Sequence, residues 1–213
     1  MGERVFIFDL DGVIVDSMPW HTQCWSIYLE RLGVPSDRLA ERMHGKHNDE
    51  IIRELFGDSL TEDQIFGHGA AKEHLYRELM APRLTEFVVP GVAAFLERHR
   101  NVPKGVASNA ELANIEFVLE GAGLRRHFDV LVDGRQVRRP KPAPEIYLRA
   151  AELLGARPEE CVIFEDSPAG LAAARDCGAR VVAVNTARAE LPGADLLVDD
   201  FLDPELEPWL RTT

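Results

Sequence analysis

The stretch VFIFDLDGVIVDS, residues 5–17, runs four apolar residues directly into two closely spaced aspartates and a glycine. The apolar run predicts a β-strand that is buried on both faces, as in a parallel sheet. Asp9 and Asp11 follow two residues apart, so extended backbone points both carboxylates to the same side. Ionised acids this close together repel each other and resist burial. The stretch therefore predicts a site, at the end of a strand, that requires negative charge.

Further apolar runs along the chain predict the other strands of a parallel sheet. They are GVA at 105–107, VIF at 162–164, RVVAV at 180–184 and DLLV at 195–198. Between these runs, apolar residues recur at helical spacing over residues 110–121 and 144–154. This alternation of strands and helices indicates an α/β fold with a doubly wound, Rossmann-like parallel sheet.

Residues 17–86 interrupt the alternation and predict a small helical unit. Thr61 and Gln64 have the spacing of a capping box at the start of a helix, and nothing in the segment has a clear strand pattern. We therefore expect residues 1–16 and 87–213 to form the α/β core domain, and residues 17–86 to form a helical cap domain inserted into it.

Composition narrows the class of ligand. The chain of 213 residues has 24 Lys and Arg against 36 Asp and Glu, a net charge of −12. Such a charge disfavours binding to nucleic acid or to an anionic membrane surface, and no apolar run approaches the roughly 20 residues of a membrane span. Three widely spaced cysteines without a CxxC pair predict neither a disulfide framework nor a zinc site. We expect a monomeric cytoplasmic protein that acts on a small molecule.

Acidic residues at two strand ends predict a metal-assisted reaction on phosphorus. In an open parallel sheet, ligands bind at the carboxyl ends of the strands. Asp9, Asp166 and Glu165 would offer hard oxygen ligands there, which suit Mg²⁺ better than Zn²⁺. A metal-held Asp9 would attack phosphorus and form an aspartyl phosphate, while Asp11 would serve as general acid and base.

Three further polar residues are candidates for binding the transferring phosphoryl group. Ser108 and Asn109 would donate hydrogen bonds to its equatorial oxygens, and Lys141 would supply a fixed positive charge. Each also has an ordinary structural explanation taken alone, since Ser108 and Asn109 resemble a helix N-cap pair and an isolated lysine is usually solvated.

Four ordered motifs resemble those of the haloacid dehalogenase superfamily. They are DLDGV at 9–13, ASN at 107–109, KPAPEIY at 141–147 and EDSPAG at 165–170. The resemblance covers essentially the whole chain, and the helical insert is similar to the cap of the subgroup that contains beta-phosphoglucomutase and phosphoglycolate phosphatase.

The resemblance implies a role for each motif residue. Asp9 would be the nucleophile, Asp11 the acid and base, and Ser108 the hydroxyl that binds the phosphoryl group. Lys141 would be the charge clamp. The implied ligands of Mg²⁺ are Asp9, Asp11 through its backbone carbonyl, Asp166 and, in some members of the family, Glu165.

Cap residues are candidates for substrate binding. Lys46 and His47 belong to HGKHN, a loop that would grip a distal phosphate or hydroxyls, although a plain solvated helix start has the same pattern. His21 is similar to a histidine that helps position the acid/base aspartate in beta-phosphoglucomutase. Asn48 stands where the resemblance to the mutases places an arginine that grips a second phosphate, and this difference favours hydrolysis.

The sequence thus predicts a Mg²⁺-dependent phosphatase acting on a small phosphate ester, with a sugar phosphate as the expected substrate. The alternative is a phosphosugar mutase of the beta-phosphoglucomutase type. A metal-independent dehalogenase is disfavoured, because that chemistry does not use the second aspartate of the DxD pair. A non-catalytic binding module is disfavoured too, since the nucleophile, the acid/base and the lysine are all present.

Overall fold

The chain forms two compact units. The structure, a computed structural model, describes residues 4–35, 39, 48–57, 59–188 and 190–212. Met1–Asp16 and Leu84–Thr213 form the core domain, and Ser17–Arg83 form the cap. The cap ends at residue 83 instead of the expected 86, because Leu84 is buried and the 3₁₀ helix η1 (Leu84–Glu86) packs against a helix of the core domain.

The described residues of the core domain form a parallel sheet of six strands. The strands are β1 (Val5–Phe8), β2 (Lys104–Ala107), β3 (Val130–Val132), β4 (Cys161–Glu165), β5 (Arg180–Val184) and β6 (Leu196–Val198). Their spatial order is β3-β2-β1-β4-β5-β6, and all neighbouring pairs are parallel. The order runs outward in opposite directions from β1 and β4, which is the doubly wound arrangement. The predicted fold class is confirmed.

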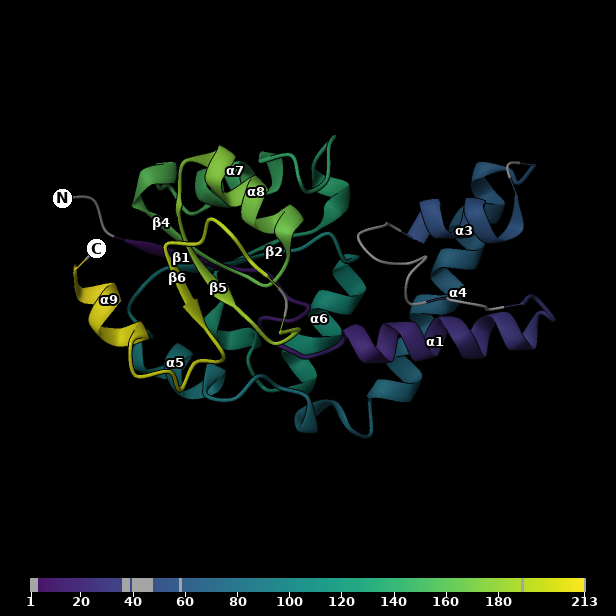
Figure 1. Ribbon diagram of the computed structural model, residues 1–213, viewed down its shortest axis with the longest axis horizontal. Coiled ribbons are helices and arrows are strands. Elements are labelled where there is room, and N and C mark those ends of the chain that lie inside the picture. The colour runs from purple at the N-terminus through teal and green to yellow at the C-terminus, as the bar shows by residue number, and fades with distance from the viewer. Residues whose placement is uncertain (1–3, 36–38, 40–47, 58, 189, 213) are drawn as a thin grey trace. The chain divides into compact units, whose positions relative to one another are not determined.

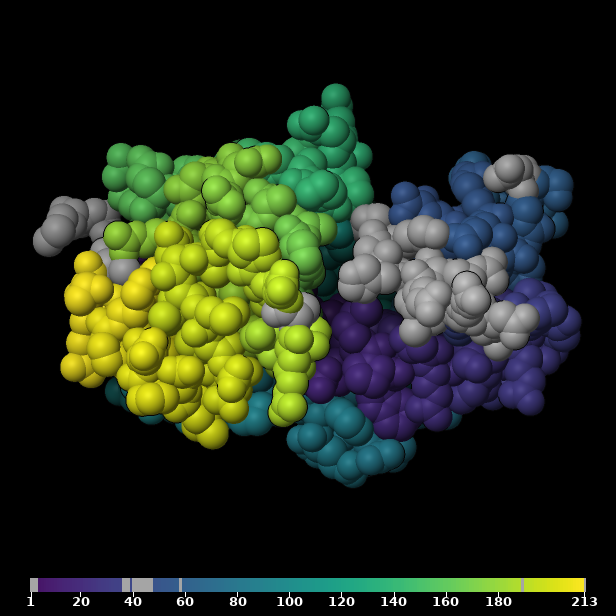
Figure 2. Space-filling model, viewed as in Figure 1, coloured from purple at the N-terminus to yellow at the C-terminus, as the bar shows by residue number. Residues whose placement is uncertain are grey.

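Helices cover both faces of this sheet. The core-domain helices are α5 (Val92–Arg98), α6 (Leu112–Gly121), α7 (Glu145–Leu153), α8 (Pro168–Cys177) and α9 (Leu206–Thr212), with short 3₁₀ helices η2 (Arg125–His127), η3 (Gly134–Gln136) and η4 (Pro158–Glu160). Helices α7 and α8 contact each other and the central strands on one face, whereas α5 lies on the opposite side (Figure 1). The C-terminal residues, yellow in Figure 2, form a continuous surface of the core domain.

The side chains of β1 explain why its sequence is apolar without interruption. Val5 and Ile7 belong to the buried cluster that includes side chains of α7 and α8. Phe6 and Phe8 point to the other face, where their ring centroids lie 5.7 and 6.3 Å from that of Phe95 in α5. Because successive residues of a strand reach opposite faces, covering both faces buries all four residues.

Strand β3 was not predicted from the sequence, whereas the other strands and helices α6 and α7 were. It spans three residues at the edge of the sheet, and Val130 and Leu131 are partly exposed. A run this short carries no periodicity, so its pairing with β2 becomes visible in the structure alone. Cys24, Cys161 and Cys177 are buried free thiols, in agreement with the prediction of no disulfide framework.

The described part of the cap is mainly helical. Its helices are α1 (Met18–Arg31), α3 (Asn48–Phe56) and α4 (Glu62–Met80). The predicted capping box is present, because Gln64 N donates to Thr61 Oγ1 at 3.3 Å and Thr61 N donates to Gln64 Oε1 at 2.9 Å. Among the described residues of the whole chain, no helix has the length and apolar character needed to cross a membrane.

A buried ion pair lies inside the cap, between neighbours on α4. Lys72 Nζ is 2.8 Å from Glu73 Oε1, and the two residues are 2% and 6% exposed. Asn48 Nδ2 donates to the same oxygen at 2.6 Å. Lys72 Nζ also lies 2.7 Å from His21 Nδ1. Burial alone would raise the pKa of Glu73, but Lys72, His21 and the hydrogen bonds lower it to about 2.

Glu73→Gln is expected to remove much of the acid sensitivity of the cap. Because the folded pKa of Glu73 lies below its ordinary value, the ionised group stabilises the fold above about pH 4.5, and this stability is lost as the pH falls towards about 2. The pKa shift of Glu73 corresponds to a contribution on the order of 3 kcal/mol to the free energy of unfolding. At neutral pH the variant should be less stable by several kcal/mol, roughly 3 to 5, because Lys72 would remain buried without its carboxylate.

Thermal unfolding measured from about pH 6 down to about pH 2.5 tests this expectation. The matched control is Glu62→Gln, which makes the same chemical change in an exposed pair with Arg53 on the same unit. The control should unfold like the parent chain, since exposed ion pairs contribute little. Equal stability of parent and Glu73→Gln at neutral pH would contradict the ion-pair interpretation.

Candidate active site

A tight turn directly after β1 positions the two aspartates. Asp9 N donates to the Phe164 carbonyl at 2.9 Å, which continues the pairing of β1 with β4 up to Asp9. Gly12 then adopts a left-handed φ of +80°, and its N donates to the Val15 carbonyl at 2.7 Å. A left-handed φ is readily adopted by glycine, so the DLDG sequence reverses the chain immediately after Asp11.

Gly12 also allows a second acid to approach the turn. A Cβ atom built on Gly12 would lie 1.9 Å from Asp166 Oδ2, so the Asp166 carboxylate occupies the space of the missing side chain. Asp166 follows β4 directly, and Asp9 follows the neighbouring strand β1. The sheet therefore brings together two acids that are far apart in the sequence.

Lys141 joins the acids of these two strands. Its Nζ lies 2.7 Å from Asp9 Oδ1 and 2.6 Å from Glu165 Oε1, and its side chain is 5% exposed. Burial alone would lower the pKa of Lys141, but Asp9 and Glu165 raise it above its ordinary value. Lys141 is therefore a buried, protonated ammonium group held against Asp9.

The negative charge that the ionised acids would carry exceeds the positive charge of Lys141. Ligand oxygens of Asp9, Glu165 and Asp166 lie within 4.8 Å of one another. Burial raises the pKa of Asp9 to about 7, with Lys141 opposing the rise and Glu165 adding to it. Burial and the neighbouring acids also raise the pKa of Asp166. A set of carboxylate oxygens with unbalanced charge fits a hard divalent cation such as Mg²⁺.

Glu165 differs from the other two acids, because protein donors surround it. It is fully buried, and its carboxylate accepts hydrogen bonds from Lys141, Tyr147 and backbone groups at the start of α8. Burial alone would raise the pKa of Glu165, but Lys141 and these donors lower it. Glu165 is thus held in its ionised form by the protein itself.

Ser108 and Asn109 lie at the end of β2, as predicted, but they do not cap a helix. Helix α6 begins at Leu112 after Glu111, so the N-cap interpretation is wrong. Ser108 is 2% exposed, and its Oγ accepts from Ala110 N at 3.2 Å. Asn109 Oδ1 accepts from Lys141 N at 3.2 Å. Asn109 therefore holds the loop that carries Lys141.

The candidate substrate residues of the cap are only partly placed. Lys46 and His47 lie outside the described residues. His21 lies in the first turns of α1, 2.7 Å from Lys72 Nζ, with its ring stacked on Tyr76 at a centroid distance of 4.1 Å. A role for these three residues in substrate binding remains a prediction.

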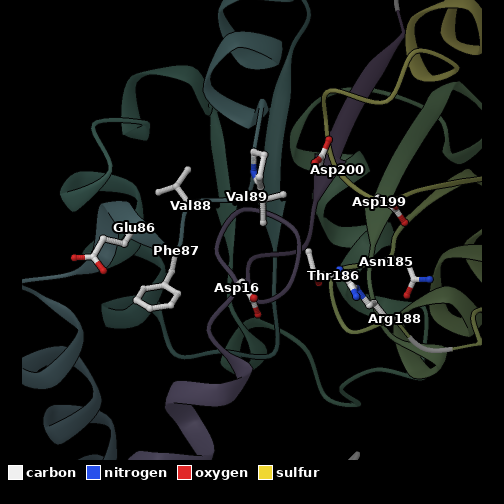
Figure 3. A pocket seen from close by; sticks show the side chains of 11 residues that line it. Asp16, Glu86, Phe87, Val88, Val89, Asn185, Thr186, Arg188, Asp199 and Asp200 are labelled. Atoms are coloured by element: carbon white, nitrogen blue, oxygen red, sulfur yellow. The ribbon is translucent and has the colours of Figure 1, made fainter.

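A cavity of about 370 Å³ lies in the core domain. Its lining includes Asp16, Asp199 and Asp200 together with Arg188 (Figure 3). Thr186, which also lines it, donates from Oγ1 to the Gly12 carbonyl at 2.8 Å. Acids predominate over cations among these lining residues, so the cavity would repel a phosphate dianion.

Sequence reasoning missed Tyr147 and Gly170 as parts of this site. Tyr147 lies in the helix predicted over residues 144–154, and its hydroxyl donates to Glu165 Oε1 at 2.7 Å. Gly170 belongs to the EDSPAG motif, and a Cβ atom on it would lie 1.7 Å from Glu165 Oε1. Neither contact has a local signal in the sequence, because both depend on the packing of α7 and α8 around β4.

The fold and the site define an α/β enzyme whose polar residues gather at the carboxyl ends of the central strands of a parallel sheet. A family model described as haloacid dehalogenase-like hydrolase matches residues 3–178. The chain therefore belongs to that family, and the sequence-based assignment to a hydrolase of this class is confirmed.

Relatives of the chain include both mutases and phosphatases. Beta-phosphoglucomutase of Bacillus subtilis is 32% identical over 96% of this chain and 92% of its own length. Hexitol phosphatase A of Escherichia coli is 33% identical over 84% of this chain and 82% of its own length. Among solved structures, beta-phosphoglucomutase from Clostridium difficile superposes with a TM-score of 0.84 at 27% identity, covering 98% of this chain and 96% of that one.

Proposed function

We propose that the chain is a Mg²⁺-dependent phosphatase that hydrolyses a small phosphorylated metabolite, a sugar phosphate, through an aspartyl phosphate on Asp9. The observation that carries this proposal is the buried ammonium of Lys141, 2.7 Å from Asp9 Oδ1 and beside Glu165 and Asp166 at the end of β4. Relatives named as phosphatases of hexitol and of fructose 1-phosphate support the class of substrate.

Each residue has a defined part in the proposed reaction. Asp9 and Asp166, with the Asp11 carbonyl, would hold Mg²⁺, whose charge lets an anionic phosphate approach the acids. Lys141 orients the Asp9 carboxylate by bonding Oδ1 and binds an oxygen of the phosphoryl group. The Ser108 hydroxyl would donate to a second oxygen of that group.

The reaction then proceeds in two displacements. An oxygen of Asp9 attacks phosphorus, the bond from phosphorus to the ester oxygen breaks, and Asp11 gives its proton to the leaving alcohol. Asp11, now ionised, takes a proton from water as that water attacks the phosphorus of the aspartyl phosphate. Inorganic phosphate leaves, and Asp9 is restored as a carboxylate.

A phosphosugar mutase is the second candidate, because mutases are among the relatives that match nearly the whole chain. A mutase must bind a bisphosphate at both ends and exclude water from the aspartyl phosphate. Asn48 stands at the position of the expected arginine. Its side-chain amide donates a hydrogen bond to Glu73, which forms an ion pair with Lys72. Because Asn48 brings no positive charge and meets a carboxylate, it favours hydrolysis over transfer.

Removal of the metal is expected to abolish turnover. Purified protein treated with excess chelator should lose at least about 100-fold in the rate of phosphate release from a panel of phosphate esters, and added Mg²⁺ should restore it. The control is chelator already saturated with Mg²⁺, which should leave the rate unchanged. Equal rates with and without excess chelator would refute the assignment of the metal.

The products distinguish the phosphatase from the mutase. The protein is incubated with Mg²⁺, beta-glucose 1-phosphate and a trace of the 1,6-bisphosphate, and both free phosphate and glucose 6-phosphate are followed. Free phosphate should predominate. Faster accumulation of glucose 6-phosphate would replace the phosphatase with the mutase, and the same comparison applies to any other sugar phosphate that the panel identifies.

A further inference from the structure

The carboxylate of Glu165 accepts hydrogen bonds on both of its oxygens. Oε1 receives Lys141 Nζ at 2.6 Å and the Tyr147 hydroxyl at 2.7 Å. Oε2 receives Asp166 N at 2.8 Å, Ser167 N at 2.9 Å and Ser167 Oγ at 3.1 Å. A carboxylate has about four lone-pair positions, so these donors occupy all of the hydrogen-bonding positions of Glu165.

The backbone of α8 fixes where this carboxylate lies. A Cβ atom on Gly170 would fall 1.7 Å from Glu165 Oε1 and 1.9 Å from its carboxyl carbon. The carboxylate therefore sits in the space that Gly170 leaves in the first turn of α8. In this position it faces Lys141 on one side and the helix N-terminus on the other.

Tyr147 contacts both partners of the pair formed by Glu165 and Lys141. The tyrosine is fully buried, and its hydroxyl donates to Glu165 Oε1. Its ring centroid lies 4.7 Å from Lys141 Nζ, within the range of a cation–π interaction. One side chain of α7 thus packs against the ammonium and hydrogen-bonds the carboxylate.

We propose that Tyr147 is a positioning residue, whose hydroxyl keeps Glu165 turned to Lys141 and away from the metal. Glu165 then holds Lys141 against Asp9, and Asp9 and Asp166 serve as the carboxylate ligands of Mg²⁺. Without the hydroxyl, Oε1 loses one of its two donors, and the nearby cation becomes a competing partner for the freed oxygen. This inference rests on the proposed function for its effect on turnover, but its effect on metal binding can be measured without any substrate.

Tyr147→Phe is the variant that tests the proposal, because it keeps the buried ring and removes the hydroxyl alone. Calorimetric titration with Mg²⁺ should show tighter binding, by about threefold or more, as Glu165 is released toward the cation. In the same variant kcat should fall by about 10-fold with little change in KM, since Lys141 is held less firmly against Asp9. Tyr28→Phe is the matched control, because it removes a hydroxyl bonded to His68 in the cap.

A double variant shows whether Tyr147 acts through Glu165. In a Glu165→Gln background, the neutral amide is a much poorer metal ligand, so adding Tyr147→Phe should leave Mg²⁺ affinity unchanged. Unchanged or weaker binding of Mg²⁺ by Tyr147→Phe alone overturns the proposal, whatever happens to kcat or to thermal stability. Tighter binding that persists in the Glu165→Gln background overturns it as well. Failure of the parent chain to bind Mg²⁺ would instead refute the proposed function.

Discussion

Asp9→Asn is expected to remove turnover while leaving the core domain folded. A carboxamide has nearly the shape of a carboxylate but does not attack phosphorus, so no aspartyl phosphate forms. The loss in kcat should be roughly 10⁴-fold or more, the scale expected when a covalent nucleophile is removed. Lys141 keeps Glu165 as its partner at 2.6 Å, so the variant does not leave a buried ammonium without a counter-charge.

The measurement pairs the rate of phosphate release with thermal unfolding of the same preparation. Asp199→Asn is the matched control, because it makes the same change at an exposed aspartate of the core domain. The control should retain the parent rate, and both variants should unfold near the parent temperature. Parent-like turnover by Asp9→Asn would exclude the covalent mechanism, and the acids would then serve the metal alone.

The sequence alone was sufficient to predict the arrangement of strand ends, because the physical signal is strong there. An uninterrupted apolar run such as VFIF is stable as a strand when both faces are covered, as they are by α5 and by α7 with α8. A polar residue directly after such a strand lies at the carboxyl edge of the sheet. Asp9, Ser108 and Asp166 are therefore expected at the same edge of the sheet.

The partners of these residues depend on contacts that no local pattern encodes. Lys141 follows the short strand β3, and its backbone N is held by Asn109, more than thirty positions earlier in the chain. Glu165 is surrounded by donors because α7 approaches it and because Gly170 leaves space for its carboxylate. The sequence predicts the acids as one group, and the structure brings their oxygens within 4.8 Å of one another, whereas the donors that surround Glu165 are visible in the structure alone.

The burial of charged residues in the cap is likewise not predictable from the local sequence. Lys72 and Glu73 are adjacent in a helix with many charges, a pattern that is typical of a solvated surface. Both are buried, because His21, Asn48 and the rings of neighbouring aromatic side chains satisfy them. A buried pair of this kind is specified by tertiary contacts, so its presence and its low glutamate pKa became evident from the structure alone.

Asp11→Asn should separate the two displacements that the proposed mechanism requires. With an ordinary sugar phosphate, kcat should fall by about 10² to 10⁴-fold, because the amide neither protonates the leaving alcohol nor takes a proton from water. With p-nitrophenyl phosphate, the leaving group needs no proton, so Asp9 should still be phosphorylated at a substantial rate. Attack by water should remain slow with both esters.

The variant mixed rapidly with p-nitrophenyl phosphate should therefore release a burst of nitrophenolate, close to one equivalent per protein, followed by a slow steady rate. Mass spectrometry of the intact protein should show the phosphorylated chain during the slow phase. The control is the double variant Asp9→Asn with Asp11→Asn, which should give neither burst nor phosphorylated protein. A steady rate equal to that of the parent would exclude Asp11 as the acid and base, and a slow rate without a burst would place its role before the attack, in binding the phosphate or the metal.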